Sequence, residues 1–450
     1  MGRKYYNPNP QKNNSNLCEN YRAICLSSVP MKVYTRIIEQ KLRNKIEKQL
    51  QEEQAAFRNG RQTQDHISTI RRTMEKLLDR EKDLYMAFID LKTAFDSVQK
   101  QYLWRALKEY DLDQKLIQII KSNYRKVEAY VRIQGEESEM FYMKTGIKQG
   151  DSLSPLLFVM FMDRIIKNCK RQCHKVKVGN WNMEPIHISN LAFADDLIVM
   201  AETPEKLQRN LNIWNQELKD NGMEINKQKT KVMKISKSEI EPGQQIKIEN
   251  EILEWVGHYD YLGTRITKNG KINAEIIHRQ SKASQVYYQL NNTIIIRKNL
   301  PTRLKCKFTT LYMYQRSQYG LESTVLNEKH LNQLQASEMK FLRRTVGKTK
   351  RDKIRNTKIR EDTEQIPIQK IIENKQLRWY GHVNRMENIR IPKRVSECKA
   401  EGKRNRGRPR TTYEEQMGQI ARKRGKTLAE IKKMSKERQI FRRWIEAPTP

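Results

Sequence analysis

The sequence lacks the features that mark several large classes of protein. Its six cysteines are scattered from Cys18 to Cys398 in a chain of 450 residues, so they do not form the dense disulfide framework of small secreted domains. The first residues, MGRKYYNPNPQKNNSN, contain no apolar stretch and do not resemble a signal peptide. The longest apolar stretch, 153–162, is about half of the roughly 20 residues that a membrane-spanning helix needs. We therefore expect neither secretion nor a membrane anchor.

Acidic residues are scarce beside basic ones. The chain has 88 Lys+Arg against 52 Asp+Glu, a formal net charge of +36, and residues 347–450 alone carry 30 basic against 13 acidic residues. Apolar residues make up only 37%, but 19 Tyr, 10 Phe and 6 Trp are enough for a hydrophobic core. This charge does not predict the fold. It indicates an anionic partner, either a nucleic acid or an acidic membrane surface, and of the two we expect nucleic acid.

The spacing of apolar residues predicts both strands and helices up to about residue 270 and mainly helices after it. The predicted helices are 33–50, 66–80, 94–110, 154–169 and 205–221, and the fourth has Ser154 as its N-cap and Pro155 as its first helical residue. The predicted strands are 84–90, 187–193 and 197–202, a hairpin of 129–135 with 140–146, and segments within 223–226, 231–236 and 259–267.

Three acidic residues stand at the ends of apolar strands. Asp90 closes LYMAFID, and Asp195 and Asp196 form the tip between LAF and LIVM. Neighbouring carboxylates beside buried strands repel one another, and a divalent cation relieves that cost. Mg²⁺ prefers such hard oxygen ligands, and two such ions stabilise the attacking and leaving oxygens of a phosphoryl transfer. By spacing alone, the pair could equally be a turn dipeptide and Asp90 a helix cap.

Two other clusters leave two readings open. The segment 146–155, GIKQGDSLSP, combines a flexible backbone, the amide of Gln149 and a helix start, so it could form the floor under a base pair or an ordinary loop and cap. Cys169, Cys173 and His174 could be half of a metal site or merely the end of a helix, since no second Cys/His pair lies near them in the sequence.

Taken in order, these segments resemble the reverse transcriptase of non-LTR (LINE-type) retrotransposons. NYRAICLSSVPMKVYTRII and QAAFRNGRQTQDH resemble the finger motifs, FIDLKTAFDSV the motif of the first catalytic aspartate, and GIKQGDSLSPLLFVMFMD the template and nucleotide-binding motif. FADDLIVMAE resembles the catalytic hairpin, NGMEINKQKTKVM the lysine motif and YDYLGTRIT the primer grip. LRWYGHVNRM and KRNRGRPRTTYEE are similar to the carboxy-terminal region of such proteins.

The resemblance implies an α+β right-hand polymerase of fingers, palm and thumb with an antiparallel palm sheet, followed by a helical and basic C-terminal region. The expected domains are 1–269 for the palm and N-terminally truncated fingers, 270–346 for a helical thumb-like region, and 347–450 for a basic nucleic-acid-binding tail. Related proteins carry an endonuclease ahead of the polymerase, and we expect none in this chain. A separate endonuclease could assist it.

The resemblance also assigns roles to residues of an RNA-directed DNA polymerase that adds dNTPs to a primer 3′-hydroxyl. Asp90, Asp195 and Asp196 become the ligands of two Mg²⁺ ions, with Mn²⁺ as a substitute, and Lys229 becomes the group that protonates pyrophosphate. The residues at the nucleotide are Phe95 as the gate against ribose, Gln149 and Gly150 beside the nascent base pair, and Arg58 and Arg61 at the triphosphate. For Phe95 a packed helix aromatic remains the alternative, and for the three basic residues simple surface charge.

The implied partners are an RNA template, a DNA primer and dNTPs, with no membrane, in the nucleus and cytoplasm. Arg406, Gly407, Arg408 and Pro409 resemble an AT-hook that binds A·T-rich DNA in the minor groove, although a generic basic linker has the same composition. A truncated, catalytically silent RNA- or DNA-binding relic of the same element is the main alternative function. An RNA-dependent RNA polymerase shares the palm chemistry, but Phe95 and Ala194 disfavour it.

Overall fold

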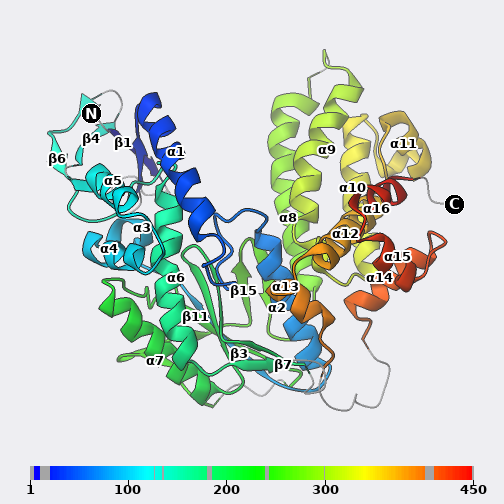
Figure 1. Ribbon diagram of the computed structural model, residues 1–450. Coiled ribbons are helices and arrows are strands. Elements are labelled where there is room, and N and C mark those ends of the chain that lie inside the picture. Colours follow the sequence, from blue (N-terminus) through cyan, green and yellow to red (C-terminus); the bar gives the residue numbers. More distant parts are fainter. Residues whose placement is uncertain are drawn as a thin grey trace.

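The computed structural model describes residues 5–10, 21–125, 127–133, 136–179, 185–238, 243–297, 299–400 and 410–447. Figure 1 shows a part that contains the central sheet, residues up to about 270, and beside it a part made of helices. Helix α1 rises on one side of the molecule and helices α8 and α9 rise on the other (Figure 1). None of the described helices is both long and apolar enough to cross a membrane.

The central sheet has five strands in the order β14-β11-β3-β10-β9. Their bounds are Glu254–Trp255, Lys231–Ile235, Leu84–Ile89, Asp196–Ala201 and Asn190–Phe193. All neighbours pair antiparallel except β11 and β14, which pair parallel. Strand β3 is buried throughout, and its alternate side chains belong to two separate hydrophobic cores. The sheet is therefore a layer covered on both faces, as a strand with no polar position requires.

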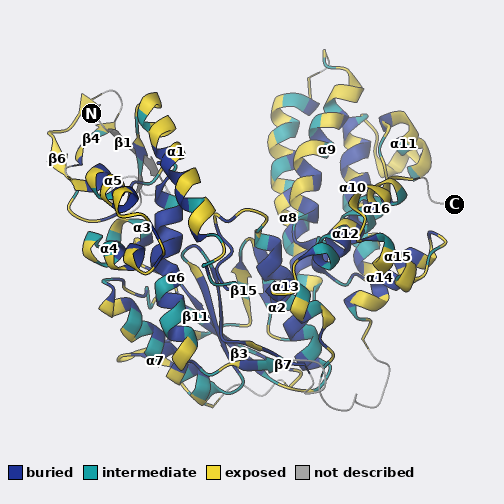
Figure 2. Ribbon diagram, in the orientation of Figure 1, coloured by how far each residue is buried: buried dark blue, intermediate teal, exposed yellow. Residues whose placement is uncertain are grey.

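Different helices cover the two faces. On the first face, Tyr85, Ala87 and Ile89 pack in one core with α6 (Ser154–Gln172) and α7 (Pro204–Asp220). On the second, the alternate residues of β3 pack with α2 (Thr63–Leu78), with the hairpin of β7 (Val176–Val178) and β8 (Ile186–Ile188), and with α13 (Ile391–Glu397). Figure 2 shows the strands and large parts of α2 and α6 as buried.

The remaining elements of the first 270 residues flank this core. A second sheet has the order β2-β1-β4-β5, with β6 also paired to β4. Its strands are Tyr21–Leu26, Tyr5–Pro10, Glu128–Ile133, Glu136–Glu137 and Phe141–Tyr142. The other helices are α1 (Val29–Ile46), α3 (Ala94–Ser97), α4 (Lys100–Lys108) and α5 (Gln114–Arg125). Two short hairpins complete the part: β12 (Lys247–Ile248) with β13 (Glu251–Ile252), and β15 (His258–Tyr261) with β16 (Thr264–Thr267).

After residue 270 the described residues form helices joined by turns and loops, with no strand among them. The α-helices before residue 347 are α8 (Asn273–Leu290), α9 (Thr302–Gln318) and α10 (Glu328–Thr345). After it come α11 (Asn356–Thr363), α12 (Ile368–Arg385), α13, α14 (Tyr413–Arg422), α15 (Leu428–Met434) and α16 (Arg438–Glu446). Ile391, Val395 and Cys398 of α13 are buried in the same core as α2. The described part of the region expected as a tail is therefore folded, and its helix α13 packs against α2, which covers the sheet.

Most predicted elements are confirmed, and five details are corrected. The segment 223–226 forms no strand, since only Ile225 pairs there, in an isolated bridge with Leu91. The predicted helix 94–110 is two helices, because Val98 between them is extended. The predicted strand 187–193 is split into β8 and β9, and the segment 259–267 is a hairpin that turns at Leu262 and Gly263, both with positive φ. Ser154 is the first residue of α6 rather than its cap, since the N-cap is Leu153 and the Ser154 hydroxyl lies 2.9 Å from that of Tyr124.

Candidate active site

The three aspartates lie where two central strands meet at one edge of the sheet. Strands β3 and β10 pair antiparallel, with Leu197 opposite Ile89. The next position in this register sets Asp196 opposite Asp90, and side chains that are directly opposite leave the same face of a sheet. Asp195 lies in the two-residue turn between β9 and β10. The fold thus places Asp90 at the same end of the sheet as Asp195 and Asp196, which follow it by 105 and 106 residues in the sequence.

The turn that carries Asp195 is held by the segment 53–56. Ala194 has a φ of 58°, a conformation that is strained for a residue with a Cβ. Its N–H donates to Oε1 of the fully buried Gln54 at 3.1 Å. On either side of Gln54, the Glu53 carbonyl accepts the Ala192 N–H at 2.9 Å, and the Ala55 N–H donates to the Ala192 carbonyl at 3.1 Å. A finger motif therefore fixes the backbone of the aspartate turn.

The lysine motif runs beside Asp90. The Asp90 carbonyl accepts the N–H of Asn226 at 2.8 Å, and the Asp90 N–H donates to the Thr230 hydroxyl at 3.3 Å. These bonds hold the loop so that Nζ of Lys229 lies 3.6 Å from Oδ2 of Asp90. The Lys229 side chain is 61% exposed, so it is paired with Asp90 but free to turn toward a ligand.

The chemistry of this donor set suits a hard divalent cation. Asp90 and Asp195 are partly exposed and Asp196 is exposed, so all three offer carboxylate oxygens to solvent. In the described part of the chain, no three His, Cys, Asp or Glu side chains converge closely enough to form a metal site as they stand. The negative charge of these aspartates nevertheless affects a neighbouring side chain, Tyr259. Burial, and then the charges of Asp196 and Asp90, raise the pKa of Tyr259 to about 12. A cation would relieve this field.

Phe95 lies in α3 and packs on α6. Its ring stacks on that of Phe158, with centroids 4.4 Å apart and planes inclined by 13°, and it stays partly exposed. The Phe95 carbonyl accepts the N–H of Ile147 at 3.0 Å. A Cβ on Gly146 would lie 2.9 Å from the Asp96 carbonyl oxygen, and the φ of Gly146 is +84°, so only glycine fits this approach. The structure therefore brings Phe95 against the loop 146–150.

Gln149 and Gly150 are clamped in that loop by strand β2. The Gln149 carbonyl accepts the N–H of Cys25 at 2.7 Å. A Cβ on Gly150 would lie 2.8 Å from the Cys25 carbonyl oxygen, and its φ is +99°. On the other side, the buried Lys148 donates to the Asn123 carbonyl at 2.8 Å. Gln149 remains partly exposed and Gly150 exposed, so both are open to a ligand beside Phe95.

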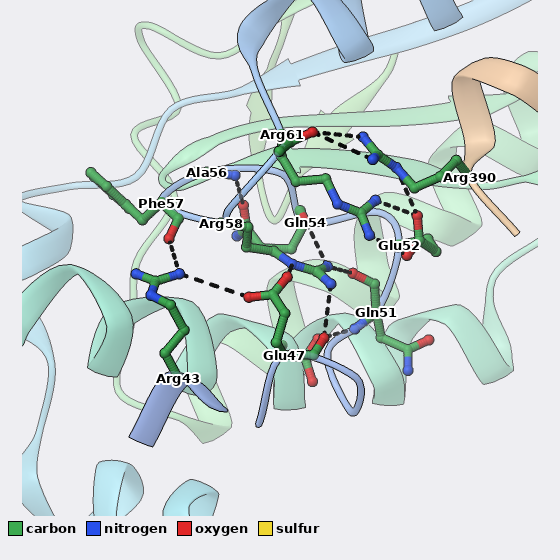
Figure 3. A network of polar contacts seen from close by, with 12 residues as sticks. Arg43, Glu47, Gln51, Glu52, Gln54, Ala56, Phe57, Arg58, Arg61 and Arg390 are labelled. Atoms are coloured by element: carbon green, nitrogen blue, oxygen red, sulfur yellow. Dashed lines mark hydrogen bonds and ion pairs between the residues drawn. The ribbon is translucent and has the colours of Figure 1, made fainter. Parts of the chain in front are cut away.

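Arg58 is buried and holds the loop, a position that argues against the predicted contact with a triphosphate. It is 6% exposed, and each nitrogen of its guanidinium donates to a protein oxygen (Figure 3). Nε donates to the Glu47 carboxylate at 2.9 Å and NH2 to the Glu47 carbonyl at 3.1 Å. NH1 donates to the carbonyls of Gln51 and Gln54 at 2.6 and 3.0 Å. Four of the five guanidinium N–H groups are thus bound within the loop and its neighbours, so the group holds the loop and has at most one N–H left for a phosphate.

Arg61 lies in the same loop and is more accessible. Its guanidinium pairs with both carboxylate oxygens of Glu52, one of them at 2.6 Å. Two positive-φ residues shape the loop, Phe57 at 55° and Gly60 at 68°. The carbonyl of Phe57 accepts a hydrogen bond from Arg43 at 2.7 Å, and Figure 3 shows the Phe57 side chain pointing away from the network. Arg61 thus remains a candidate for the triphosphate contact.

The other clusters take no part in this site. Cys169 and Cys173 are buried in the core of α6, and burial raises the pKa of the Cys173 thiol to about 12, so neither behaves as a ready metal ligand. Arg406, Gly407, Arg408 and Pro409 lie outside the described residues.

Three residues that sequence reasoning missed join the site's elements. Besides Gln54, His66 of α2 lies with Nδ1 3.2 Å from the Tyr261 hydroxyl of β15, and its ring meets that of Phe193 edge to face at 6.0 Å. Burial lowers the pKa of His66 to about 3, so the ring is neutral. Arg390 of the C-terminal region reaches the loop of Arg61. The first two lie in or beside the recognised finger motif, but only long-range contacts show what they do.

Comparison with known proteins gives a consistent picture. A family model described as reverse transcriptase (RNA-dependent DNA polymerase) matches residues 10–266. The Retrovirus-related Pol polyprotein from type-1 retrotransposable element R2 of Nasonia vitripennis is 28% identical over 267 residues, 57% of this chain and 25% of that protein. The corresponding polyprotein from type-2 retrotransposable element R2DM of Drosophila melanogaster is 30% identical over 200 residues, 42% of this chain and 18% of that protein. This chain therefore spans a quarter or less of the length of these two relatives. Among solved structures, apo telomerase from Candida tropicalis aligns with 95% of this chain and 67% of its own at 15% identity, with a TM-score of 0.43.

Proposed function

The chain belongs to the reverse transcriptase (RNA-dependent DNA polymerase) family, and we propose that it extends a DNA primer with dNTPs on an RNA template. The observation that carries the proposal is the placement of Asp90, Asp195 and Asp196 at the ends of the antiparallel strands β3, β10 and β9, in a sheet covered on both faces. The predicted resemblance to a retrotransposon reverse transcriptase is confirmed by the family model and the relatives. The structure has the predicted mixture of helices and strands, with a helical C-terminal region.

The three aspartates would hold two divalent cations, Mg²⁺ or in its place Mn²⁺. When bound, such ions stabilise the attacking and leaving oxygens of an in-line phosphoryl transfer. The chain's own residues orient the substrates around that centre. Lys229, 3.6 Å from Asp90, carries a proton that it can give to the departing pyrophosphate. Positioning and electrostatic stabilisation are the main sources of rate in phosphoryl transfer, so these fixed charges matter most.

Selection of the nucleotide falls to the surface beside the aspartates. Phe95 is held by its stack on Phe158 and by the close approach of the loop 146–150. A rigid ring at this place would crowd the 2′-hydroxyl of a ribonucleotide. Gln149 and Gly150 would line the nascent base pair, and Arg61 would contact the triphosphate.

The basic surface would bind the RNA template and the DNA primer through their phosphates. The segment Arg406–Pro409 would add contacts with A·T-rich DNA. Deletion of 403–410 should then reduce binding to A·T-rich duplex more than binding to a G·C-rich one. Equal loss on both duplexes would favour a generic basic linker.

Primer extension tests the function directly. The full chain is supplied with an RNA template, a DNA primer, dNTPs and Mg²⁺, beside Asp195→Asn and the control Asp362→Asn. Asp362 is an exposed residue of α11, so its loss should leave extension unchanged. Extension by the native chain and the control, with none by Asp195→Asn, supports the enzyme. Absence of extension in all three, with retained RNA binding, supports the catalytically silent relic.

A further inference from the structure

Arg390 joins the C-terminal region to the loop that carries Arg61. It contacts Gly60 of that loop, 330 residues earlier in the sequence. It is the N-cap residue of α13 and is only 9% exposed. Helix α13, which begins after Arg390, is held in place because Ile391 and Val395 are buried in the core with α2. Lys76 of α2 also donates to the carbonyls of the last turn of α13. Arg390 therefore extends from a rigid support.

The Arg390 guanidinium meets three groups: the carboxylate of Glu52 (Figure 3), the carbonyl of Gly60 in the loop, and Asp65 at the start of α2. NH2 donates to Oδ2 of Asp65 at 2.8 Å. NH1 and NH2 both lie 3.4 Å from the carbonyl oxygen of Gly60, and Nε lies 3.6 Å from Oε2 of Glu52. Asp65 in turn accepts the N–H of Gln62 at 3.1 Å, where the loop enters the helix. The planar guanidinium of Arg390 thus binds the loop at its bend, Gly60, and at the start of α2, where the loop ends.

The loop needs such an outside support because its own conformation is unusual. Gly60 has a φ of +68°, a backbone conformation that favours glycine, although a Cβ there would meet nothing within 4 Å. Phe57, three residues earlier, also has a positive φ, and its carbonyl is bound by Arg43 of α1. Two guanidinium groups from separate elements therefore pin the two bends of the loop.

Glu52 gives Arg390 a second role. In this structure the Glu52 carboxylate pairs with Arg61 on one side and faces Arg390 on the other. For Arg61 to contact a triphosphate it must leave Glu52, and a largely buried carboxylate without a counter-ion is costly. Arg390 stays beside Glu52 when Arg61 turns away, so it supplies the remaining positive charge.

We propose that Arg390 is a positioning residue for dNTP binding: it fixes the loop 55–62 and remains as the counter-ion of Glu52 when Arg61 engages the triphosphate. The C-terminal region is then part of the nucleotide site, not only a nucleic-acid-binding appendage. The expected effect on the KM for dNTP rests on the proposed polymerase function. The support of the loop by Arg390 does not depend on that function.

The variants Arg390→Gln and Arg390→Lys test the proposal, with Arg394→Gln as the matched control. Arg394 lies one turn further along α13 and is exposed. Primer extension at varied dNTP concentration should give a KM for dNTP about tenfold higher in Arg390→Gln, with a smaller change in kcat. Arg390→Lys should recover only part of the loss, since an ammonium cannot form the fork. In a Glu52→Gln background, the effect of Arg390→Gln on KM should fall to less than half.

Hydrogen exchange of the backbone gives a readout that does not need activity. Residues 58–62 should exchange faster in Arg390→Gln than in the native chain and in Arg394→Gln. If both the exchange and the KM match those of Arg394→Gln, the proposal is overturned. If the native chain does not extend primers but exchange at 58–62 still rises, the support of the loop stands and the proposed function fails. A loss of kcat without a rise in KM would also contradict the role assigned to Arg390.

Discussion

The side-chain oxygen of Gln54 accepts a hydrogen bond of 3.1 Å from the backbone N–H of Ala194, the residue before the aspartate pair. Gln54 is completely buried, and the same oxygen accepts the Ala56 N–H at 3.0 Å. One amide thus sets both the loop after residue 54 and the strained turn between β9 and β10. The geometry of Asp195 and Asp196 therefore depends on a residue that lies in neither β9 nor β10.

Replacing Gln54 should lower both the stability of the fold and the rate of catalysis. In Gln54→Met the chain keeps the volume but leaves two buried N–H groups without an acceptor, a cost of about 1–3 kcal/mol for each such group. The turn should relax, and kcat should fall by at least about tenfold, because small displacements of catalytic groups are expensive. Steady-state primer extension and thermal unfolding measure the two effects. Loss of stability with kcat unchanged would show that Gln54 supports the fold alone.

Phe95 should control the choice between deoxyribonucleotides and ribonucleotides. Phe95→Val removes the ring that is held against Phe158 at 4.4 Å, so a ribose 2′-hydroxyl should be accommodated. The ratio of kcat/KM for dNTP to that for the matching NTP should fall by about tenfold or more, the value of one good steric contact. Phe158→Leu serves as the comparison, because it loosens the stack but keeps the gate. An unchanged ratio in Phe95→Val would leave Phe95 as a packing residue.

Lys229 should affect chemistry and leave stability unchanged. Its side chain is 61% exposed, and exposed ion pairs contribute little to folding, so Lys229→Ala should unfold at nearly the native temperature. If Lys229 protonates pyrophosphate, kcat for single-nucleotide addition should fall by about 10²-fold, as for loss of a general acid. Lys227→Ala is the control, since Lys227 pairs with Glu249 and Glu251 instead of Asp90. Equal kinetics in the two variants would reduce Lys229 to surface charge.

The sequence was informative where function is local and uninformative where it depends on contacts across the chain. Asp90 and Asp195 follow apolar strands, so strand periodicity alone places them at the ends of buried elements. Arg58 and Arg61 are three residues apart in one basic loop and look alike in the sequence. Only the fold shows that Arg58 is buried with four of its five N–H groups bound by the protein, whereas Arg61 pairs with Glu52 and is more accessible.

The C-terminal region illustrates the same limit. Its charge predicted a nucleic-acid-binding tail, and charge does report on partners, but it does not report on packing. The apolar residues of α13, such as Ile391 and Val395, are few and lie among basic ones. Their burial against α2 depends on a complementary surface more than 300 residues away in the sequence. No local pattern encodes that pairing.

Two buried neighbours at the start of α2 should give the stability opposite dependences on pH. Burial lowers the pKa of His66 to about 3, from an ordinary value of 6.5. Below pH 6.5 the unfolded chain binds a proton that the native chain refuses, so stability is lost as the pH falls. From pH 6.5 to 5 this loss amounts to about 2 kcal/mol. Burial raises the pKa of Asp65 to about 6, from 3.8, although Arg390 opposes the shift. The native chain therefore binds the Asp65 proton first, and this group adds stability as the pH falls from 6 toward 3.8.

Urea unfolding at pH 7.5, 6.5, 5.5 and 5.0 separates the two contributions in the variants His66→Gln and Asp65→Asn. Relative to the native chain, His66→Gln should lose less stability as the pH falls, because the refused proton is gone. Asp65→Asn should lose more, because the proton that favoured the native state is gone. Each difference should level off to a constant offset toward pH 7.5, which lies one unit or more above the pKa of either group in either state. Parallel curves for both variants would mean that His66 and Asp65 titrate in the folded chain as they do in water, and the buried, neutral state assigned to His66 beside the catalytic hairpin would be wrong.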